Sequence, residues 1–310
     1  MILYLHLGYP KTATKFLQRE YFSKSKKINY LGKPFDKDFI NLFKEITQKK
    51  TFKVINLKKK KIIDKLSKEK INLISQESFF SIFYNGDNNI EKSLYNLKKF
   101  FNFKNLELKI FFLMRNQEDL FLSLFTESFL KIKKKYKIYS LENFIDCLDN
   151  KEKNLFFENL IYKKRIYILN KIFGRNNIKV FYYEDLKFNF NIFKKDLIKY
   201  LDLNYNEEKK YLRNKLVHVS DKKNKKYVSN ETYLLSEKLS KFWFYKKLKK
   251  VVKKDIRLKL KNYFDLNYVE NSTNIYYKNL YYRNKIKNFF RKENINMGMN
   301  KKKLKKFNYI

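Results

Sequence analysis

The residues with the clearest capacity for chemistry lie near the start of the chain, in the segment Gly8-Tyr-Pro-Lys-Thr-Ala-Thr14. An apolar run precedes this segment and an amphipathic pattern follows it, so it is expected to join a strand to a helix. Glycine at the end of a strand allows a tight turn, and the free N–H groups and positive dipole end of a helix attract an anion. Lys11 adds a mobile cation. The segment therefore predicts a phosphate-binding loop.

The composition of the chain sharpens this prediction. The chain has 5 Gly and 2 Pro, its only alanine is Ala13, and one residue of each type falls in this loop. The spacing is not that of a Walker A loop, because Gly8 is followed five residues later by Ala13 and Thr14 rather than by Gly-Lys-Ser or Gly-Lys-Thr. We expect Ala13 to be tolerated, since a residue at a helix start can keep a negative φ. The alternative interpretation is a tight strand-to-helix turn with an incidental lysine.

A second informative segment covers residues 109–125. A buried strand is expected to end at Arg115, and Asn116 is expected to cap the following helix, with Asp119 as its capping-box partner. Ser123 falls on the same helical face as Asn116. Because ligands bind at the carboxyl ends of parallel strands, this segment predicts that Arg115 points into a ligand crevice.

Together the two segments resemble the sulfotransferase family. The first is similar to the family's 5′-phosphosulfate loop, G-x-P-K-[ST]-G-T, with Ala13 and Lys15 as departures, and the spacing from Arg115 to Ser123 is similar to its 3′-phosphate site. The resemblance implies that the chain uses 3′-phosphoadenosine 5′-phosphosulfate, without a metal, in a P-loop NTPase-like fold. It assigns donor binding to Gly8, Lys11, Thr12, Ala13, Thr14, Lys15, Arg115 and Ser123.

Three weaker likenesses extend this resemblance toward bacterial and carbohydrate-directed members. Residues Ile71–Phe79 resemble the strand that carries the acceptor-activating base, Lys179–Leu186 a late strand with its helix start, and Asn271–Tyr277 the C-terminal helix. The family's donor-binding loop in the C-terminal third is not evident, and the unranked candidates for it are Arg213, Lys222, Lys223 and Ser229.

The residues also suggest how a sulfuryl group would be transferred. Charge develops on the oxygen between sulfur and phosphate, and Lys11 is placed to stabilise it, together with the 12–15 backbone and the hydroxyls of Thr12 and Thr14. The acceptor must lose a proton, and Glu77 is the predicted base. A surface or helix-capping role for Glu77 is the alternative. The expected acceptor is a hydroxyl of a carbohydrate or a similar small molecule, whose identity the sequence leaves open.

The order of apolar patterns predicts an α/β fold, a central parallel sheet flanked by helices on both faces, followed by a helical C-terminal part. The expected strands are 2–7, 28–31, 71–75, 108–114 and 178–183. The expected helices are 13–23, 36–48, 57–68, 89–103, 117–134, 154–174, 184–201, 232–262 and 276–292. We expect a single domain over 1–310, with the α/β core at about 1–205 and a basic extension at about 206–310 that ends in a frayed tail over 299–307.

The formal net charge of +41 would ordinarily suggest nucleic acid or an anionic membrane as a partner. The excess is mostly lysine, spread along a chain rich in Asn, Ile, Phe and Tyr, as A+T-rich codons would produce, so no specific nucleic acid is expected. Proximity to an anionic membrane and the oligomeric state stay open. A single cysteine and short apolar runs favour a cytoplasmic protein. Two alternatives are a P-loop kinase-like phosphotransferase and a basic nucleic-acid-binding protein.

Overall fold

The computed structural model describes residues 1–9, 11–32, 63–76, 90–125, 141–149, 160–213, 280–295 and 297–310. The chain divides into two compact units. The first comprises Met1–Leu124, Cys147–His218 and Ile286–Ile310, and the second comprises Phe125–Asp146 and Val219–Lys285. The sheet lies in the first unit. Within the second unit, Lys285 forms an ion pair of 2.9 Å with Asp146, the last residue of α8 (Leu141–Asp146).

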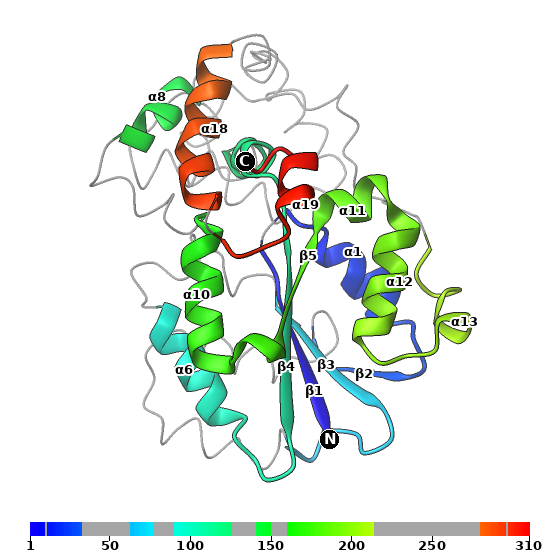
Figure 1. The fold of residues 1–310 in the computed structure, drawn as a ribbon. Coiled ribbons are helices and arrows are strands. Elements are labelled where there is room, and N and C mark those ends of the chain that lie inside the picture. Colours follow the sequence, from blue (N-terminus) through cyan, green and yellow to red (C-terminus); the bar gives the residue numbers. More distant parts are fainter. Residues whose placement is uncertain are drawn as a thin grey trace, which may run out of the picture. The chain divides into compact units, whose positions relative to one another are not determined.

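The first unit is built on a sheet of five parallel strands in the order β2-β3-β1-β4-β5 (Figure 1). The strands are β1 (Ile2–Leu7), β2 (Ile28–Tyr30), β3 (Ile71–Gln76), β4 (Glu107–Met114) and β5 (Ile178–Tyr182). All five were predicted to within a residue at each end. The chain places β2 and β3 on one side of β1, and then β4 and β5 on the other side. β1 and β4 are therefore neighbours at the point where the strand order reverses. The carboxyl ends of these two strands are the expected binding edge of such a sheet.

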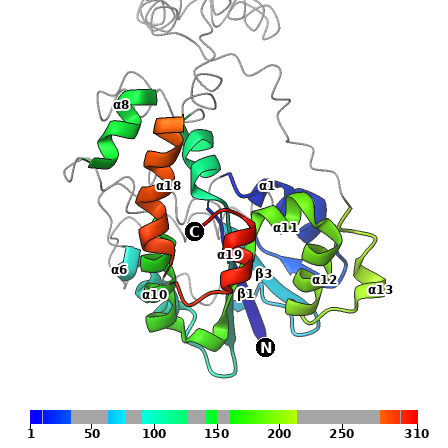
Figure 2. The same ribbon diagram turned by 45° about the horizontal axis from the view of Figure 1, so that its top comes forward.

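Helices cover both faces of this sheet, as predicted (Figures 1 and 2). One side carries α6 (Ile90–Phe100) and α10 (Tyr162–Phe173). The other carries α1 (Thr14–Leu17) with the π-helical segment Gln18–Phe22, α11 (Tyr183–Phe188) and α12 (Phe190–Tyr200), and α13 (Tyr205–Glu208) follows α12. Residues 117–125 are helical as well. The helix expected over 184–201 is interrupted at Asn189, and the helices expected over 36–48 and 232–262 lie outside the described residues.

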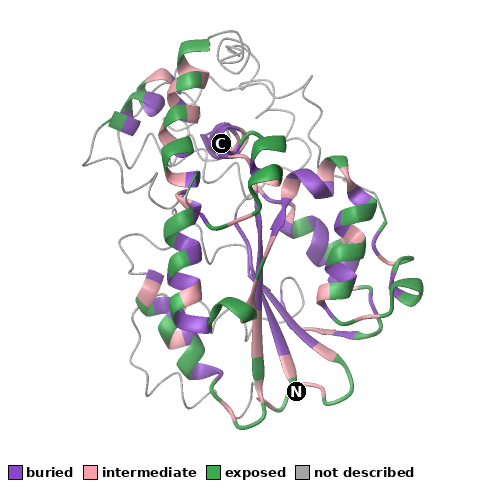
Figure 3. Ribbon diagram, viewed as in Figure 1, coloured by how far each residue is buried: buried purple, intermediate pink, exposed green. Residues whose placement is uncertain are grey.

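Aromatic side chains dominate the core on the α11 and α12 side of the sheet. Phe111 of β4 is fully buried, and the rings of Phe181 and Tyr200 meet it edge-to-face at 5.9 and 5.7 Å. Burying one such side chain contributes about 1.5–3 kcal/mol, and edge-to-face contacts add to this. The three central strands, β1, β3 and β4, are buried along most of their length (Figure 3), as expected of a parallel sheet covered on both faces.

The C-terminal residues correct one prediction. Residues 299–307 were expected to fray, yet α19 (Lys301–Lys306) forms there, with the side chain of Asn300 accepting a hydrogen bond from the Lys303 amide at its N-terminus. The apolar residues among the lysines explain the difference, because Leu304, Phe307 and Tyr309 are all buried. The preceding helix, α18, spans Leu280–Asn294.

The side chain of His6 is buried in β1. Its ring stacks on Phe111 at 4.7 Å, meets Phe22 edge-on, and makes a 2.7 Å hydrogen bond between Nδ1 and the Ser75 hydroxyl. Its Nε2 atom has no hydrogen-bond partner. Burial lowers the pKa of His6 from 6.5 to about 3, because a charged imidazolium would lack solvation there.

Acid should therefore destabilise the protein through His6. The pKa of His6 is lower in the folded protein than in the unfolded chain, so the unfolded chain takes up a proton first as the pH falls. The contribution of neutral His6 to the free energy of unfolding is therefore complete above pH 6.5 and is lost as the pH falls toward about 3. Between pH 6.5 and about pH 4 the loss should be about 3 kcal/mol. Urea unfolding of the wild type and of His6→Asn across this range measures it, and the wild-type free energy of unfolding should fall more steeply. Parallel profiles for the two proteins would contradict the assignment.

Candidate functional site

The loop between β1 and α1 obtains its tight curvature from residues other than its glycine. Lys11 and Ala13 both have left-handed backbones, with φ of 66° and 61°. Gly8 instead continues the β1–β3 ladder, because its amide donates a hydrogen bond of 3.1 Å to the Gln76 carbonyl. The expectation of a negative φ at Ala13 was therefore wrong, as was the placement of the tight turn at Gly8. A left-handed residue with a Cβ is strained by about 1–2 kcal/mol.

The threonine hydroxyls of this loop hold its shape from inside. Thr12 and Thr14 are both buried, and both hydroxyls donate to the carbonyl of Tyr9, at 2.7 and 3.5 Å. α1 starts at Thr14, one residue after the predicted start, and the Leu17 amide makes the first bond within the helix, to the Ala13 carbonyl. The preceding amides of the first turn thus lack partners inside the helix. Lys11 is half-buried and Lys15 is exposed.

Arg115 joins this loop to the end of β4. Its Nη1 atom donates to the Lys11 carbonyl at 2.9 Å, so the two cationic residues predicted from separate segments are brought together. The backbone of Arg115 is fixed by Tyr162 of α10, whose hydroxyl accepts from the Arg115 amide at 3.0 Å and donates to its carbonyl at 2.8 Å. These bonds hold the arginine at the carboxyl edge shared by β1 and β4.

The guanidinium of Arg115 retains capacity for a ligand. Its carbon lies 4.8 Å from the ring centre of Tyr183, the first residue of α11, in cation–π geometry. The Nε atom is buried and has no hydrogen-bond partner. An unpaired buried donor costs about 1–3 kcal/mol, so an anion that accepted this hydrogen bond would relieve a penalty as well as gain an attraction.

Asn116 caps the helix that follows β4, as predicted, with its Oδ1 accepting from the amides of Glu118 and Asp119 at 3.0 and 3.3 Å. The capping-box partner is different from the one expected. The Asn116 amide donates at 2.7 Å to Oε1 of Glu184 in α11, rather than to the side chain of Asp119. A carboxylate from a distant helix therefore completes the cap.

Glu184 also binds the C-terminal tail, residues 307–310. Its Oε2 atom accepts a 2.9 Å hydrogen bond from the Tyr309 hydroxyl. Burial raises the pKa of Glu184, and the hydrogen bonds from Asn116 and Tyr309 oppose this rise. Burial, with the nearby Glu184 carboxylate as a second cause, raises the pKa of Tyr309 well above its usual value, so its hydroxyl remains a donor.

Several predicted residues are not placed in this cluster by the part of the chain that the structure describes. Ser123 is half-buried on the helix over 117–125, seven residues and so about 10 Å along the axis from the Asn116 cap. Glu77 directly follows β3 but lies outside the described residues, as do 271–277 and the candidates Lys222, Lys223 and Ser229. Arg213 is exposed and donates to the Lys210 carbonyl.

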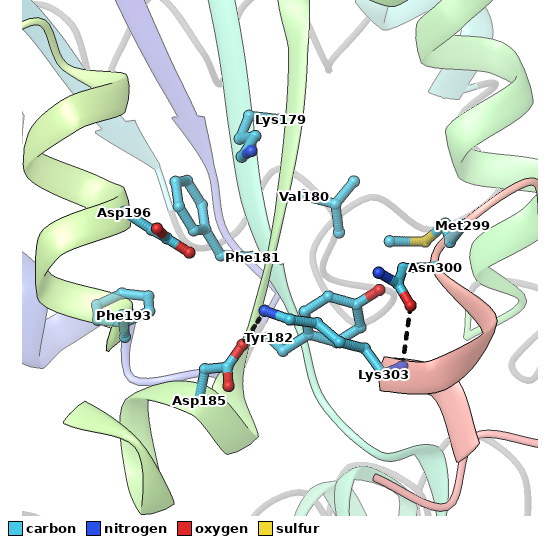
Figure 4. A pocket seen from close by; sticks show the side chains of 10 residues that line it. All are labelled: Lys179, Val180, Phe181, Tyr182, Asp185, Phe193, Asp196, Met299, Asn300 and Lys303. Carbon is cyan, nitrogen blue, oxygen red and sulfur yellow. Dashed lines mark hydrogen bonds and ion pairs between the residues drawn. The ribbon is translucent and has the colours of Figure 1, made fainter. Parts of the chain in front are cut away.

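A pocket of about 260 Å³ opens beside β5 (Figure 4). Its walls come from β5, α11, α12 and the start of α19, and Lys303 crosses it to reach Asp185 at 2.6 Å. None of the predicted site residues lines this pocket. It is distinct from the Arg115 cluster, because Arg115, Tyr183 and Glu184 are not among the residues that line it.

Sequence reasoning missed the aromatic and acidic partners of Arg115 and Asn116. Those partners are Tyr162, Tyr183 and Glu184, and Tyr309 in turn donates to Glu184. Tyr183 is the last residue of the strand predicted over 178–183 and Glu184 follows it, and this position at a strand end was the available signal for them. In the part of the chain that the structure describes, no group of three or more His, Cys, Asp or Glu could hold a metal ion. No helix in the described ranges has the length and apolar character needed to cross a membrane.

Comparison with known proteins gives a likeness in structure alone. No family model and no curated protein matches the sequence. Among solved structures, the chain is similar to a sulfotransferase from Alicyclobacillus acidocaldarius, with a TM-score of 0.45 and 14% identity over 66% of this chain and 81% of the other. A likeness at this level identifies neither the reaction nor the ligand.

The left-handed backbone at Ala13 makes a testable prediction about substitutions there. Glycine adopts this conformation without strain, whereas a β-branched residue is a severe outlier in it. Ala13→Gly should leave the free energy of unfolding within about 1 kcal/mol of wild type, because relief of strain offsets the added freedom of the unfolded chain. Ala13→Val should lower it by at least about 2 kcal/mol. Urea denaturation measures both, and equal stabilities of the two variants would exclude a left-handed residue 13.

Proposed function

We propose that the protein is a sulfotransferase that moves a sulfuryl group from 3′-phosphoadenosine 5′-phosphosulfate to an acceptor hydroxyl. The observation that carries this proposal is the 2.9 Å bond from the Arg115 guanidinium to the Lys11 carbonyl. It joins the two segments that the sequence predicts to bind anions, which follow the neighbouring strands β1 and β4. A nucleotide with phosphates at both its 3′ and 5′ positions carries two separate anionic groups, so each segment would bind one of them.

In this proposal Arg115 binds the 3′-phosphate. Its side chain is half-buried, one guanidinium face lies on Tyr183, and its Nε proton is unpaired. Arginine offers a planar fork that matches phosphate oxygens, and a hydrogen bond to a charged group contributes about 1.5–3 kcal/mol. Ser123 would add a neutral donor from the neighbouring helix, as the resemblance to the family implies.

The loop between β1 and α1 would receive the 5′-phosphosulfate. The first-turn amides of α1 supply N–H donors, and the strain at Lys11 and Ala13 marks the loop as held in shape by its surroundings. Because Thr12 and Thr14 donate to Tyr9, their hydroxyls would have to turn in order to donate to a phosphate. The Lys11 ammonium would stabilise charge on the bridging oxygen.

The transfer itself is an in-line displacement at sulfur. The acceptor oxygen forms a bond to sulfur while the bond between sulfur and the bridging oxygen breaks, and adenosine 3′,5′-bisphosphate leaves. The acceptor proton passes to a general base, for which Glu77 remains our candidate. It follows the last residue of β3, and β3 is the neighbour of β1 in the sheet. A carbohydrate hydroxyl is the proposed acceptor.

Calorimetry with two nucleotides tests the donor site. The wild type should bind adenosine 3′,5′-bisphosphate at least about tenfold more tightly than adenosine 5′-monophosphate, because only the first offers a phosphate to Arg115. Arg115→Ala should erase most of this preference while changing monophosphate affinity little.

Lys11→Ala is the matched control, since it removes one cation from the same site at the opposite end of the nucleotide. It should weaken both nucleotides by the same factor and so preserve their ratio. Equal affinities of the wild type for the two nucleotides would refute a 3′-phosphate site, and with it the proposed function.

A further inference from the structure

The C-terminal tail, residues 307–310, lies against the segment that follows β4. The side chain of Asn116 donates to the carbonyls of Phe307 and Asn308, at 3.0 and 2.7 Å. Asn294, at the end of α18, is fully buried and donates to the Tyr309 carbonyl at 2.9 Å. Four hydrogen bonds of the tail, counting that of the Tyr309 hydroxyl, therefore fix its path beside Arg115.

Further contacts make the tail part of the folded unit. The ring of Tyr309 meets Tyr182 edge-to-face at 5.9 Å and lies 6.3 Å from that of Tyr162, the residue that holds the Arg115 backbone. At the start of α19, Lys303 pairs with Asp185 (Figure 4). Both the tail and the helix that precedes it are thus anchored, and Tyr309 is only 3% exposed.

Two consecutive hydrogen bonds connect the tail to the backbone next to Arg115. The Tyr309 hydroxyl donates to one oxygen of Glu184 at 2.9 Å, and the other oxygen accepts from the Asn116 amide at 2.7 Å. A carboxylate held from both sides has one orientation, so it fixes the peptide that joins Arg115 to Asn116. The direction of the Arg115 side chain depends on that peptide.

The tail supports the arginine without covering its guanidinium. The hydrogen bonds of the tail go to Asn116, Asn294 and Glu184, whereas the Arg115 guanidinium donates to Lys11 and lies on Tyr183. The buried Nε atom remains unpaired with the tail in place. This arrangement fits a wall that positions a binding group, and it does not fit a plug that competes for it.

We propose that Tyr309, acting through Glu184, is a positioning residue that holds Arg115 in the direction needed to bind the 3′-phosphate of the donor. This inference rests on the proposed function for the identity of the ligand. The hydrogen-bond chain that carries it is independent of that function, so the two can be tested separately.

Tyr309→Phe removes the hydroxyl and keeps the ring. The ratio of affinities for adenosine 3′,5′-bisphosphate and adenosine 5′-monophosphate should fall by about fivefold, the effect of about 1 kcal/mol, while monophosphate affinity stays the same. Tyr200→Phe is the matched control. It removes another tyrosine hydroxyl, which donates to the Ile110 carbonyl of β4 at 3.1 Å, and it should cost stability without changing the ratio.

Hydrogen exchange gives a readout that needs no nucleotide. The amide of Asn116 should exchange several-fold faster in Tyr309→Phe than in the wild type or Tyr200→Phe, because Glu184 loses one of its two fixed partners. A wild-type preference for the bisphosphate that survives in Tyr309→Phe would overturn this inference and leave the proposed function standing. Tighter bisphosphate binding in Tyr309→Phe would identify the tail as a plug and also overturn it. Equal affinities of the wild type for both nucleotides would overturn the proposed function first.

Discussion

The candidate site depends on one hydrogen bond, from the Arg115 guanidinium to the Lys11 carbonyl. It can form because β1 and β4 are parallel neighbours, so the residues that follow them emerge at the same edge. Two segments about a hundred residues apart in the chain thereby become one surface. A backbone carbonyl uses only part of the guanidinium, and the face against Tyr183 and the unpaired Nε leave it suited to an anion. The order of the strands therefore brings the two segments together, and the Arg115 side chain joins them.

Local strain and buried hydrogen bonds complete the loop that faces Arg115. The chain contains 5 Gly, and the left-handed positions at 11 and 13 are held by Lys and Ala instead. Such residues persist only where their surroundings over-determine the backbone. Here the buried hydroxyls of Thr12 and Thr14 both donate to Tyr9, and Ala13 packs against the core beneath the loop. The loop is consequently shaped before a ligand arrives, which reduces the ordering that binding would require.

Sequence patterns predicted the strands well because each strand is a short apolar run, and buried parallel strands need such runs. They also singled out Lys11, in the loop after β1, and Arg115, directly after β4, which the structure joins by a hydrogen bond. They failed where the outcome depends on contacts between distant residues. Nothing local to Asn116 indicates that Glu184 would replace Asp119 as its partner. The many lysines at the C-terminus predicted fraying, but the apolar side chains between them, Leu304, Phe307 and Tyr309, are buried in the fold. The φ of Ala13 was mispredicted because the curvature of the loop is shared among residues that the pattern treats one at a time.

A crystal structure grown with adenosine 3′,5′-bisphosphate tests the central claim most directly. The account predicts one phosphate within hydrogen-bond distance of the Arg115 guanidinium, including its Nε atom, and the other at the loop that carries Lys11. It also predicts that the Tyr309 hydroxyl remains on Glu184 in that complex. Nucleotide bound away from both residues, or bound only after the tail has left Glu184 and Asn116, would contradict the account.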